Sequence, residues 1–262
     1  MIKELLKNCV ILLNRKLFNL FGVRFTRNLP FASSVRILDP TAHGVITSVK
    51  ERTMTDENRL YNAIIATRYV SENSIQGDIV ECGVWRGGSM MAIASTLVTL
   101  EDTARRLYLY DTFEGMTKPS TFDFRFDGAK AKDLLEDRSD RGKNEYEAGV
   151  IAFASLSDVK AGMLSTRYPE ERIIYEVGMV ENSLNSNSHE CLSLVRLDTD
   201  WYESTKHELE ILWPKLSPGG VLIIDDYDHW TGARKATDEF FSNLRVKPLF
   251  MAMNSGRILI KP

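Results

Sequence analysis

The chain of 262 residues carries a formal net charge of −3, with 44% hydrophobic and 26% charged residues. This composition is typical of a soluble globular protein, and the length suffices for one large α/β domain with a substantial core. The small negative charge gives no general attraction to nucleic acid, and the three cysteines have no paired spacing that would indicate disulfides or a zinc site. No apolar run approaches the roughly 20 residues of a membrane span, and no cleavable leader is evident. We therefore expect a cytoplasmic protein without a nucleic-acid partner.

Residues 1 to about 27 have apolar side chains at roughly helical spacing and mostly positive charges, which predicts an amphipathic helix. Most such helices cover a core or a second subunit, and we expect a homo-oligomer; a basic helix can also make a peripheral contact with an anionic membrane. Residues 40–56 look like a loop, of which residues 44–55 would close as a lid over a bound cofactor. This N-terminal part, residues 1–56, precedes one domain over residues 57–262, whose first helix has Thr55 as a plausible N-cap.

Beyond Gly77, short apolar runs alternate with helical patterns. The pattern predicts helices over 89–100, from about 157, over 204–212 and over 233–241, and strands over 78–82, 107–111, 173–177, 192–197, 221–224, about 249–251 and 257–260. This alternation is typical of a Rossmann-like α/β fold with a mostly parallel, seven-stranded sheet and helices on both faces. A hairpin turn before the last strand predicts an antiparallel edge strand. A polar segment, about 117–147, reads as a solvated insertion rather than core.

The first strand, 78–82, ends in a glycine-rich turn that leads directly into a helix. Glycine lets the backbone approach a ligand closely, and the helix start presents free N–H groups. A dinucleotide site would require G-x-G-x-x-G, whereas this turn has a carboxylate, Glu81, immediately before it. That carboxylate would repel pyrophosphate but suits the ammonium group of S-adenosylmethionine, which carries a sulfonium and no phosphate. The turn therefore indicates an S-adenosylmethionine site at Glu81, Cys82 and Gly83.

Two further strand ends extend this cofactor site. Asp111, at the end of the second strand, suits a hydrogen bond to ribose hydroxyls. Phe113 either packs on adenine or is a core aromatic residue. The turn after strand 173–177 would line the adenine pocket with Val180 and Glu181, although Glu181 could also be a solvated loop charge.

Carboxylates gather at the ends of the next two strands of the pattern. Asp198 and Asp200 follow strand 192–197, and Asp225, Asp226 and Asp228 follow strand 221–224. One such aspartate could simply cap a helix, but two acidic strand ends that converge repel each other unless a cation holds them. An all-oxygen ligand set suits Mg²⁺, which keeps exchangeable waters for a substrate.

Five segments between about Thr53 and Phe241 resemble, in order, the macrocin O-methyltransferase (TylF-type) family. They are Glu-Cys-Gly-Val-Trp-Arg-Gly-Gly-Ser (81–89), Tyr-Asp-Thr-Phe-Glu-Gly-Met (110–116), Leu-Asp-Thr-Asp-Trp-Tyr-Glu-Ser-Thr (197–205), Leu-Ser-Pro-Gly-Gly-Val-Leu-Ile-Ile-Asp-Asp-Tyr (216–227) and Gly-Ala-Arg-Lys-Ala-Thr-Asp-Glu-Phe (232–240). The resemblance implies a class I methyltransferase fold and methylation of a sugar hydroxyl. It implies S-adenosylmethionine at Glu81, Gly83, Ser89 and Asp111, and Mg²⁺ at Asp198, Asp225 and Asp226, with Asp200 as a candidate general base.

The expected reaction is in-line methyl transfer to a hydroxyl of a vicinal diol on a small-molecule or glycan acceptor, with Mg²⁺ as Lewis acid. His229 is the alternative base, because an ordinary histidine titrates near neutrality. A catechol or phenol is the alternative acceptor. Two other classes are weaker: an NAD(P)-dependent oxidoreductase lacks its second glycine here, and a non-catalytic scaffold would have no need of every expected carboxylate.

Overall fold

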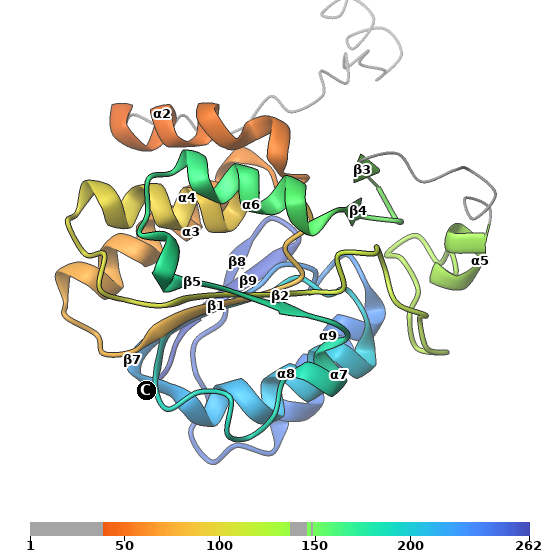
Figure 1. Cartoon of the computed structure of the whole chain (residues 1–262). Coiled ribbons are helices and arrows are strands. Elements are labelled where there is room, and N and C mark those ends of the chain that lie inside the picture. The colour runs from red at the N-terminus through yellow and green to blue at the C-terminus, as the bar shows by residue number, and fades with distance from the viewer. Residues whose placement is uncertain (1–38, 137–145, 148) are drawn as a thin grey trace, which may run out of the picture. The chain divides into compact units, whose positions relative to one another are not determined.

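The computed structural model describes residues 39–136, 146–147 and 149–262, and the predicted N-terminal amphipathic helix lies outside these residues. Within the described ranges, seven strands form one sheet in the order β5-β2-β1-β6-β7-β9-β8 (Figure 1). Their bounds are β1 Asp78–Cys82, β2 Leu107–Asp111, β5 Ile173–Val177, β6 Leu192–Leu197, β7 Leu216–Ile224, β8 Met251–Met253 and β9 Gly256–Ile260. The first five strands of that order are parallel, whereas β9 is antiparallel to β7 and to the edge strand β8. The predicted fold class is therefore confirmed, with the antiparallel strand one place in from the edge.

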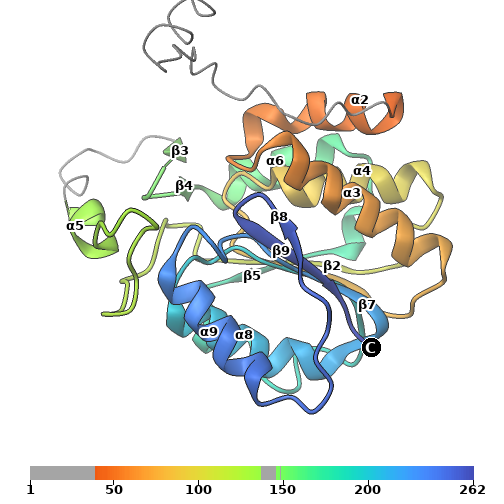
Figure 2. The ribbon, with the colours of Figure 1, turned by 180° about the vertical axis from the view of Figure 1, so that it is seen from behind.

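Helices cover both faces of the sheet. One face carries α2 Pro40–Val49, α3 Glu57–Glu72, α4 Gly88–Thr99 and α6 Leu156–Ser165, and the other carries α7 Val180–Ser183, α8 Tyr202–Lys215 and α9 Thr231–Ser242 (Figures 1 and 2). Two short 3₁₀ helices, Lys50–Arg52 and Glu170–Arg172, follow α2 and precede β5. A separate apolar core lies on each side of the sheet. Every residue of the central strand β6 is therefore buried, whichever face its side chain is on.

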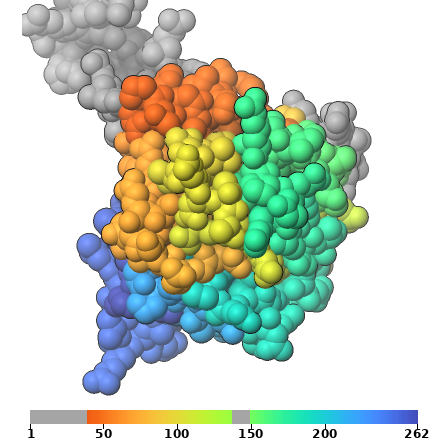
Figure 3. All heavy atoms as spheres, turned by 60° about the vertical axis from the view of Figure 1, so that its left-hand side comes forward, coloured from red at the N-terminus to blue at the C-terminus, as the bar shows by residue number. Residues whose placement is uncertain are grey.

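The expectation of a loop over residues 40–56 is wrong, because α2 occupies most of it. Asp39 caps this helix by accepting a hydrogen bond from the Ala42 N–H, and Pro40 stands at its first position. Arg68 of α3 pairs with the same aspartate. Figure 3 shows α2 (orange) lying across α4 (yellow) and beside α6 (green). Only the residues after the 3₁₀ turn, from Thr53, reach the site described below.

The N-cap of α3 also differs from the prediction. Asp56, not Thr55, accepts hydrogen bonds from the N–H groups of Asn58 and Arg59, at 2.9 and 3.1 Å. Aspartate competes well for this position because its carboxylate reaches two free helix donors at once. Thr55 is thereby released, and its hydroxyl accepts a hydrogen bond from Arg196.

The predicted insertion is only partly the solvated segment that its charges suggested. It contains α5 Ala131–Glu136 and β3 Tyr146–Glu147, which pairs with β4 Phe153–Ala154 beyond it. Ala131 is fully buried in a small core with Trp201, Trp230 and Ala233. Asp123 is also buried, and its carboxylate accepts the Tyr202 N–H at the start of α8. The insertion therefore docks at the start of α8 and α9.

None of the helices in residues 39–136, 146–147 and 149–262 is long and apolar enough to cross a bilayer.

Candidate active site

A cavity of about 320 Å³ opens at the carboxyl ends of the parallel strands. Strand order reverses there, since β1 has β2 on one side and β6 on the other. Ligands of open α/β sheets bind at such a reversal, and small-molecule sites enclose roughly 300–1,000 Å³. Of the residues predicted for the site, the cavity is lined by Gly83, Ser89, Asp111, Val180, Glu181, Asp198, Asp200, Asp225, Asp226 and His229.

Asp111 organises the glycine-rich turn between β1 and α4. One carboxylate oxygen accepts the N–H groups of Val84 and Trp85, at 2.8 and 3.1 Å, and the other accepts the Phe113 N–H at 2.8 Å. Burial nevertheless raises the pKa of Asp111, against the lowering effect of these three donors. Oδ2 already accepts two N–H groups, so a further donor such as a ribose hydroxyl would bind at Oδ1, which accepts one of the three.

Gly83 is required for the close approach of this turn to the end of β6. Its φ of +79° lies in the left-handed region, and a Cβ there would overlap the backbone carbonyl oxygen of Asp198. The turn and the acidic end of β6 are thus neighbours because position 83 has no side chain.

Glu81 lies under the cavity rather than in its lining. It is 1% exposed, and its Oε1 accepts a hydrogen bond of 2.5 Å from Nη1 of Arg196 on the neighbouring strand. Its Oε2 is buried and accepts no hydrogen bond from the described residues. Burial raises the pKa of Glu81 to about 7, although Arg196 acts in the opposite direction.

Arg196 also binds carboxylates of the acidic strand ends. Its Nη1 donates to Asp198 Oδ2 at 2.7 Å, and its Nη2 lies 2.9 Å from Asp225 Oδ1. A second cation, Arg59 of α3, lies 2.5 Å from the other oxygen of Asp225. Asp225 is therefore held between two guanidinium groups.

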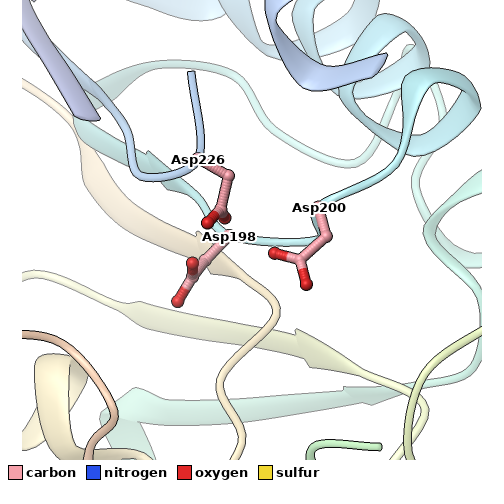
Figure 4. Close-up of side chains that lie close together, drawn as sticks. All are labelled: Asp198, Asp200 and Asp226. Atoms are coloured by element: carbon pink, nitrogen blue, oxygen red, sulfur yellow. The ribbon is translucent and has the colours of Figure 1, made fainter. Parts of the chain in front are cut away.

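Asp198, Asp200 and Asp226 come together in the cavity, and we call them the acidic triad. Each offers a carboxylate oxygen, and these three oxygens all lie within 4.8 Å of one another. Figure 4 shows the side chains converging from the end of β6, the loop before α8 and the loop after β7. Asp200 has a φ of +70°, which turns this loop back toward the strand end; aspartate tolerates that conformation better than most residues.

Burial makes the ionised form of the triad unfavourable. It raises the pKa of Asp198 and Asp226 well above the usual range and that of Asp200 to about 7, and neighbouring carboxylates add to this effect. Asp226 Oδ2 is buried and accepts no hydrogen bond from the described residues. A divalent cation among these oxygens would remove the repulsion, so the donor set fits a hard metal ion such as Mg²⁺.

Three predicted residues lie outside the cavity lining. Glu81 acts from beneath through Arg196, as described above. The side chain of Cys82 is fully buried in the core on the α8 side of the sheet. Phe113 is 6% exposed and packs in the core on the opposite side, although its backbone N–H binds Asp111. Cys82 approaches the site only through its carbonyl oxygen, which accepts the Asp198 N–H.

Sequence reasoning did not select Arg59, Arg196 or Glu208. The two arginines read as ordinary helix and strand residues, since only folding brings them to the carboxylates. Glu208 is fully buried on α8, where its Oε1 accepts the hydroxyl of Thr199 at 2.9 Å and so holds the residue between two triad members. The sequence did contain a signal for two of them: Arg196 stands within an apolar strand, and Glu208 stands among the apolar residues of a helix, where a charge needs a partner.

Strand order, glycine turn and acidic strand ends together define a class I methyltransferase fold. The sequence model of the macrocin O-methyltransferase (TylF) family matches residues 41–255. The chain therefore belongs to the macrocin O-methyltransferase family, as its motifs predicted.

Individual relatives agree with this assignment. The chain is 35% identical over 175 residues to the 8-demethyl-8-(2,3-dimethoxy-α-L-rhamnosyl)-tetracenomycin-C 4′-O-methyltransferase of Streptomyces olivaceus, covering 67% of this chain and 62% of that protein. It is 29% identical to the demethyldecarbamoylnovobiocin O-methyltransferase of Streptomyces niveus, covering 72% and 67%. The crystallised O-methyltransferase NovP superposes with a TM-score of 0.68 at 25% identity, covering 80% and 82%. The match thus spans less than two thirds of the first relative.

Proposed function

We propose that the chain transfers the methyl group of S-adenosylmethionine to a sugar hydroxyl of a glycosylated metabolite or polysaccharide, in a Mg²⁺-dependent reaction. The observation that carries this proposal is the presence of the Asp111-bound glycine turn and the acidic triad in one cavity. Family membership supports the reaction type, and the first relative is named for a reaction on a rhamnosyl compound.

Residues from three strand ends would hold S-adenosylmethionine. Gly83 and Ser89 line the cavity at the turn, where the amino-acid part would lie, and Asp111 would accept ribose hydroxyls. Val180 and Glu181 line the cavity beyond β5, where the adenine would lie. Glu81 is the proposed partner of the ammonium group: it lies beneath the lining, where Arg196 holds its Oε1, and its Oε2 accepts no hydrogen bond from the described residues.

Asp198 and Asp226 would hold Mg²⁺, with Asp225 as the predicted third ligand. When bound, the ion supplies Lewis-acid activation of a hydroxyl and can orient a vicinal diol. Asp198 and Asp226 belong to the acidic triad, whereas Asp225 pairs with Arg59 and Arg196. To bind the ion, Asp225 would therefore have to give up its contact with one of these two arginines.

Asp200 is the proposed base that takes the hydroxyl proton. Its carboxylate lies in the triad, next to the oxygens proposed for the ion, so a hydroxyl bound to the ion would be within its reach. His229 is the alternative: it lines the cavity, and burial lowers its pKa, so its imidazole is neutral and can accept a proton. Asn substitutions at both positions decide between them when Mg²⁺ affinity is measured as well, since loss of the base abolishes methyl transfer while both S-adenosylmethionine and Mg²⁺ still bind.

Methyl transfer can be measured by mass spectrometry with S-adenosylmethionine, Mg²⁺ and a panel of rhamnosides and catechols. We expect S-adenosylhomocysteine and a singly methylated rhamnoside, and no product when EDTA removes the metal. Product from catechols alone would contradict the sugar acceptor. Equal turnover in EDTA would contradict the metal dependence but not the methyl transfer.

A further inference from the structure

An aromatic ladder leads from the core, through two residues that line the cavity, to an exposed ring. It consists of Trp201, Trp230, His229 and Phe126, whose successive ring centroids are 4.9, 5.1 and 5.5 Å apart. Trp201 and Trp230 are 2% and 3% exposed, whereas Phe126 is 69% exposed. His229 and Trp230 line the cavity, so the exposed ring adjoins the lining at His229.

Phe126 is held in place by its backbone. The Phe126 N–H donates to the His229 carbonyl at 2.9 Å, which fixes the insertion to the residue that lines the cavity. The turn is closed by hydrogen bonds of 2.8 Å from the Gly128 N–H to the Arg125 carbonyl and from the Arg125 N–H to the Ala129 carbonyl. Arg125 also pairs with Asp127 at 2.6 Å. The ring is therefore presented on a rigid tip.

We propose that Phe126 binds the aglycone of the acceptor, the group attached to the sugar that is methylated. The inference rests on the proposed sugar methyl transfer and deepens it. A sugar bound at the triad could direct its substituent past His229, whose ring contacts Phe126. An exposed phenyl ring gains most from a flat apolar group, through burial and ring–ring contact. The aglycone chemistry that fits is therefore a planar aromatic ring.

Phe122 provides a matched control on the same insertion. It is 43% exposed, but its ring packs against Tyr202 with centroids 4.8 Å apart and lies under the ammonium group of Lys235 at 5.0 Å. Unlike Phe126, it has no ring contact to His229 among the described residues. Removing Phe122 therefore perturbs the insertion surface without removing the end of the ladder.

The test compares phenyl and methyl α-L-rhamnopyranoside, which share the sugar and differ in the aglycone. Binding to the full chain is measured by calorimetry with S-adenosylhomocysteine and Mg²⁺ present. We expect the wild-type protein and the Phe122→Ala variant to bind the phenyl glycoside about three- to tenfold more tightly. Phe126→Ala should bind both glycosides equally, and Phe126→Trp should restore the preference.

Two kinds of failure are distinguishable. If Phe126→Ala keeps the preference, or if the wild-type protein methylates both glycosides but binds them equally, the aglycone contact is refuted and the proposed function stands. If Phe122→Ala also loses the preference, the effect belongs to the whole insertion and the assignment to Phe126 is refuted. If the wild-type protein binds S-adenosylhomocysteine but neither binds nor methylates either glycoside, the proposed function fails for this sugar class, and the inference fails with it.

Discussion

Arg196 and Glu81 face each other in register on neighbouring strands β6 and β1, with Nη1 and Oε1 2.5 Å apart and both side chains buried. The same guanidinium binds Asp198 and Asp225. One buried cation therefore connects the carboxylate proposed for the cofactor with two carboxylates proposed for the metal.

Arg196→Met should destabilise the protein severely. It leaves buried carboxylates without their cation, and breaking a buried pair in this way costs about 3–5 kcal/mol. Urea unfolding measures the change. In the double variant Arg196→Met/Glu81→Gln, part of the loss should be recovered, because one of the uncompensated charges is gone. Arg125→Met, which removes an exposed pair with Asp127, is the control and should change the unfolding midpoint little. A strictly additive double variant would show that the pair does not act as a unit.

Asp225→Asn distinguishes a metal ligand from a partner of the arginines. If Asp225 binds Mg²⁺, the variant should lose most of its methyl transfer and bind Mg²⁺ at least about tenfold more weakly, a change of about 1.4 kcal/mol. S-adenosylmethionine binding should remain largely intact, because it depends on other strand ends. Calorimetry measures both affinities. Unchanged Mg²⁺ affinity with reduced stability would instead assign Asp225 to Arg59 and Arg196 alone.

The stability of the metal-free protein should fall as the pH rises toward neutrality. The pKa of Asp200 is 3.8 in its ordinary state and about 7 in the fold, so between these values the folded chain binds a proton that the unfolded chain has released. The raised pKa of Glu81, also about 7, acts in the same direction. Folding is thus favoured at the acidic end of this window and loses that advantage by about pH 7.

Mg²⁺ should replace these protons at neutral pH. Thermal unfolding followed across the window, with EDTA or with Mg²⁺, should show the largest stabilisation by Mg²⁺ at and above pH 7. Calorimetry in buffers of different ionisation enthalpy should detect proton release on binding. A stabilisation by Mg²⁺ that does not depend on pH would contradict protonation of the acidic triad.

Gly83→Ala should disrupt the site more than an equivalent change at another left-handed glycine. A methyl group at position 83 meets the Asp198 carbonyl oxygen, so the turn must move, and we expect a loss of about 2–4 kcal/mol together with weaker S-adenosylmethionine binding. Gly128→Ala is the matched control, because its φ of +89° carries the same strain but no atom lies within 4 Å of the added methyl group. Equal losses in the two variants would show that backbone strain alone accounts for the effect.

Gly44→Ala should stabilise the protein. Gly44 is an exposed residue inside α2 with open space around its Cα, and alanine favours a helix interior over glycine by about 0.5–1 kcal/mol. The gain should appear as a higher midpoint of thermal unfolding. A lower midpoint would contradict a helical, open environment for Gly44 in the folded protein.

The sequence by itself determined the order of the seven sheet strands, the class of fold, the family and ten of the residues that line the cavity. It could do so because buried parallel strands are short apolar runs, and because ligands bind where those runs end, so that Gly83, Asp111, Asp198 and Asp226 are marked by position alone. It missed α2, whose start is signalled by the Asp-Pro pair at 39–40, because the pattern beyond that pair looked like a loop.

Only the tertiary structure decided how the charges are paired. Whether Asp225 faces a metal or Arg59, and whether Glu81 reaches the cavity or Arg196, depends on contacts between strands and helices far apart in the chain. The same holds for Phe126, which reads as an insertion residue until its backbone is seen bound to His229. The local pattern of apolar and polar residues indicates which segments are buried and where strands end. The energy of a buried charge depends instead on its neighbours in space, which that pattern does not specify.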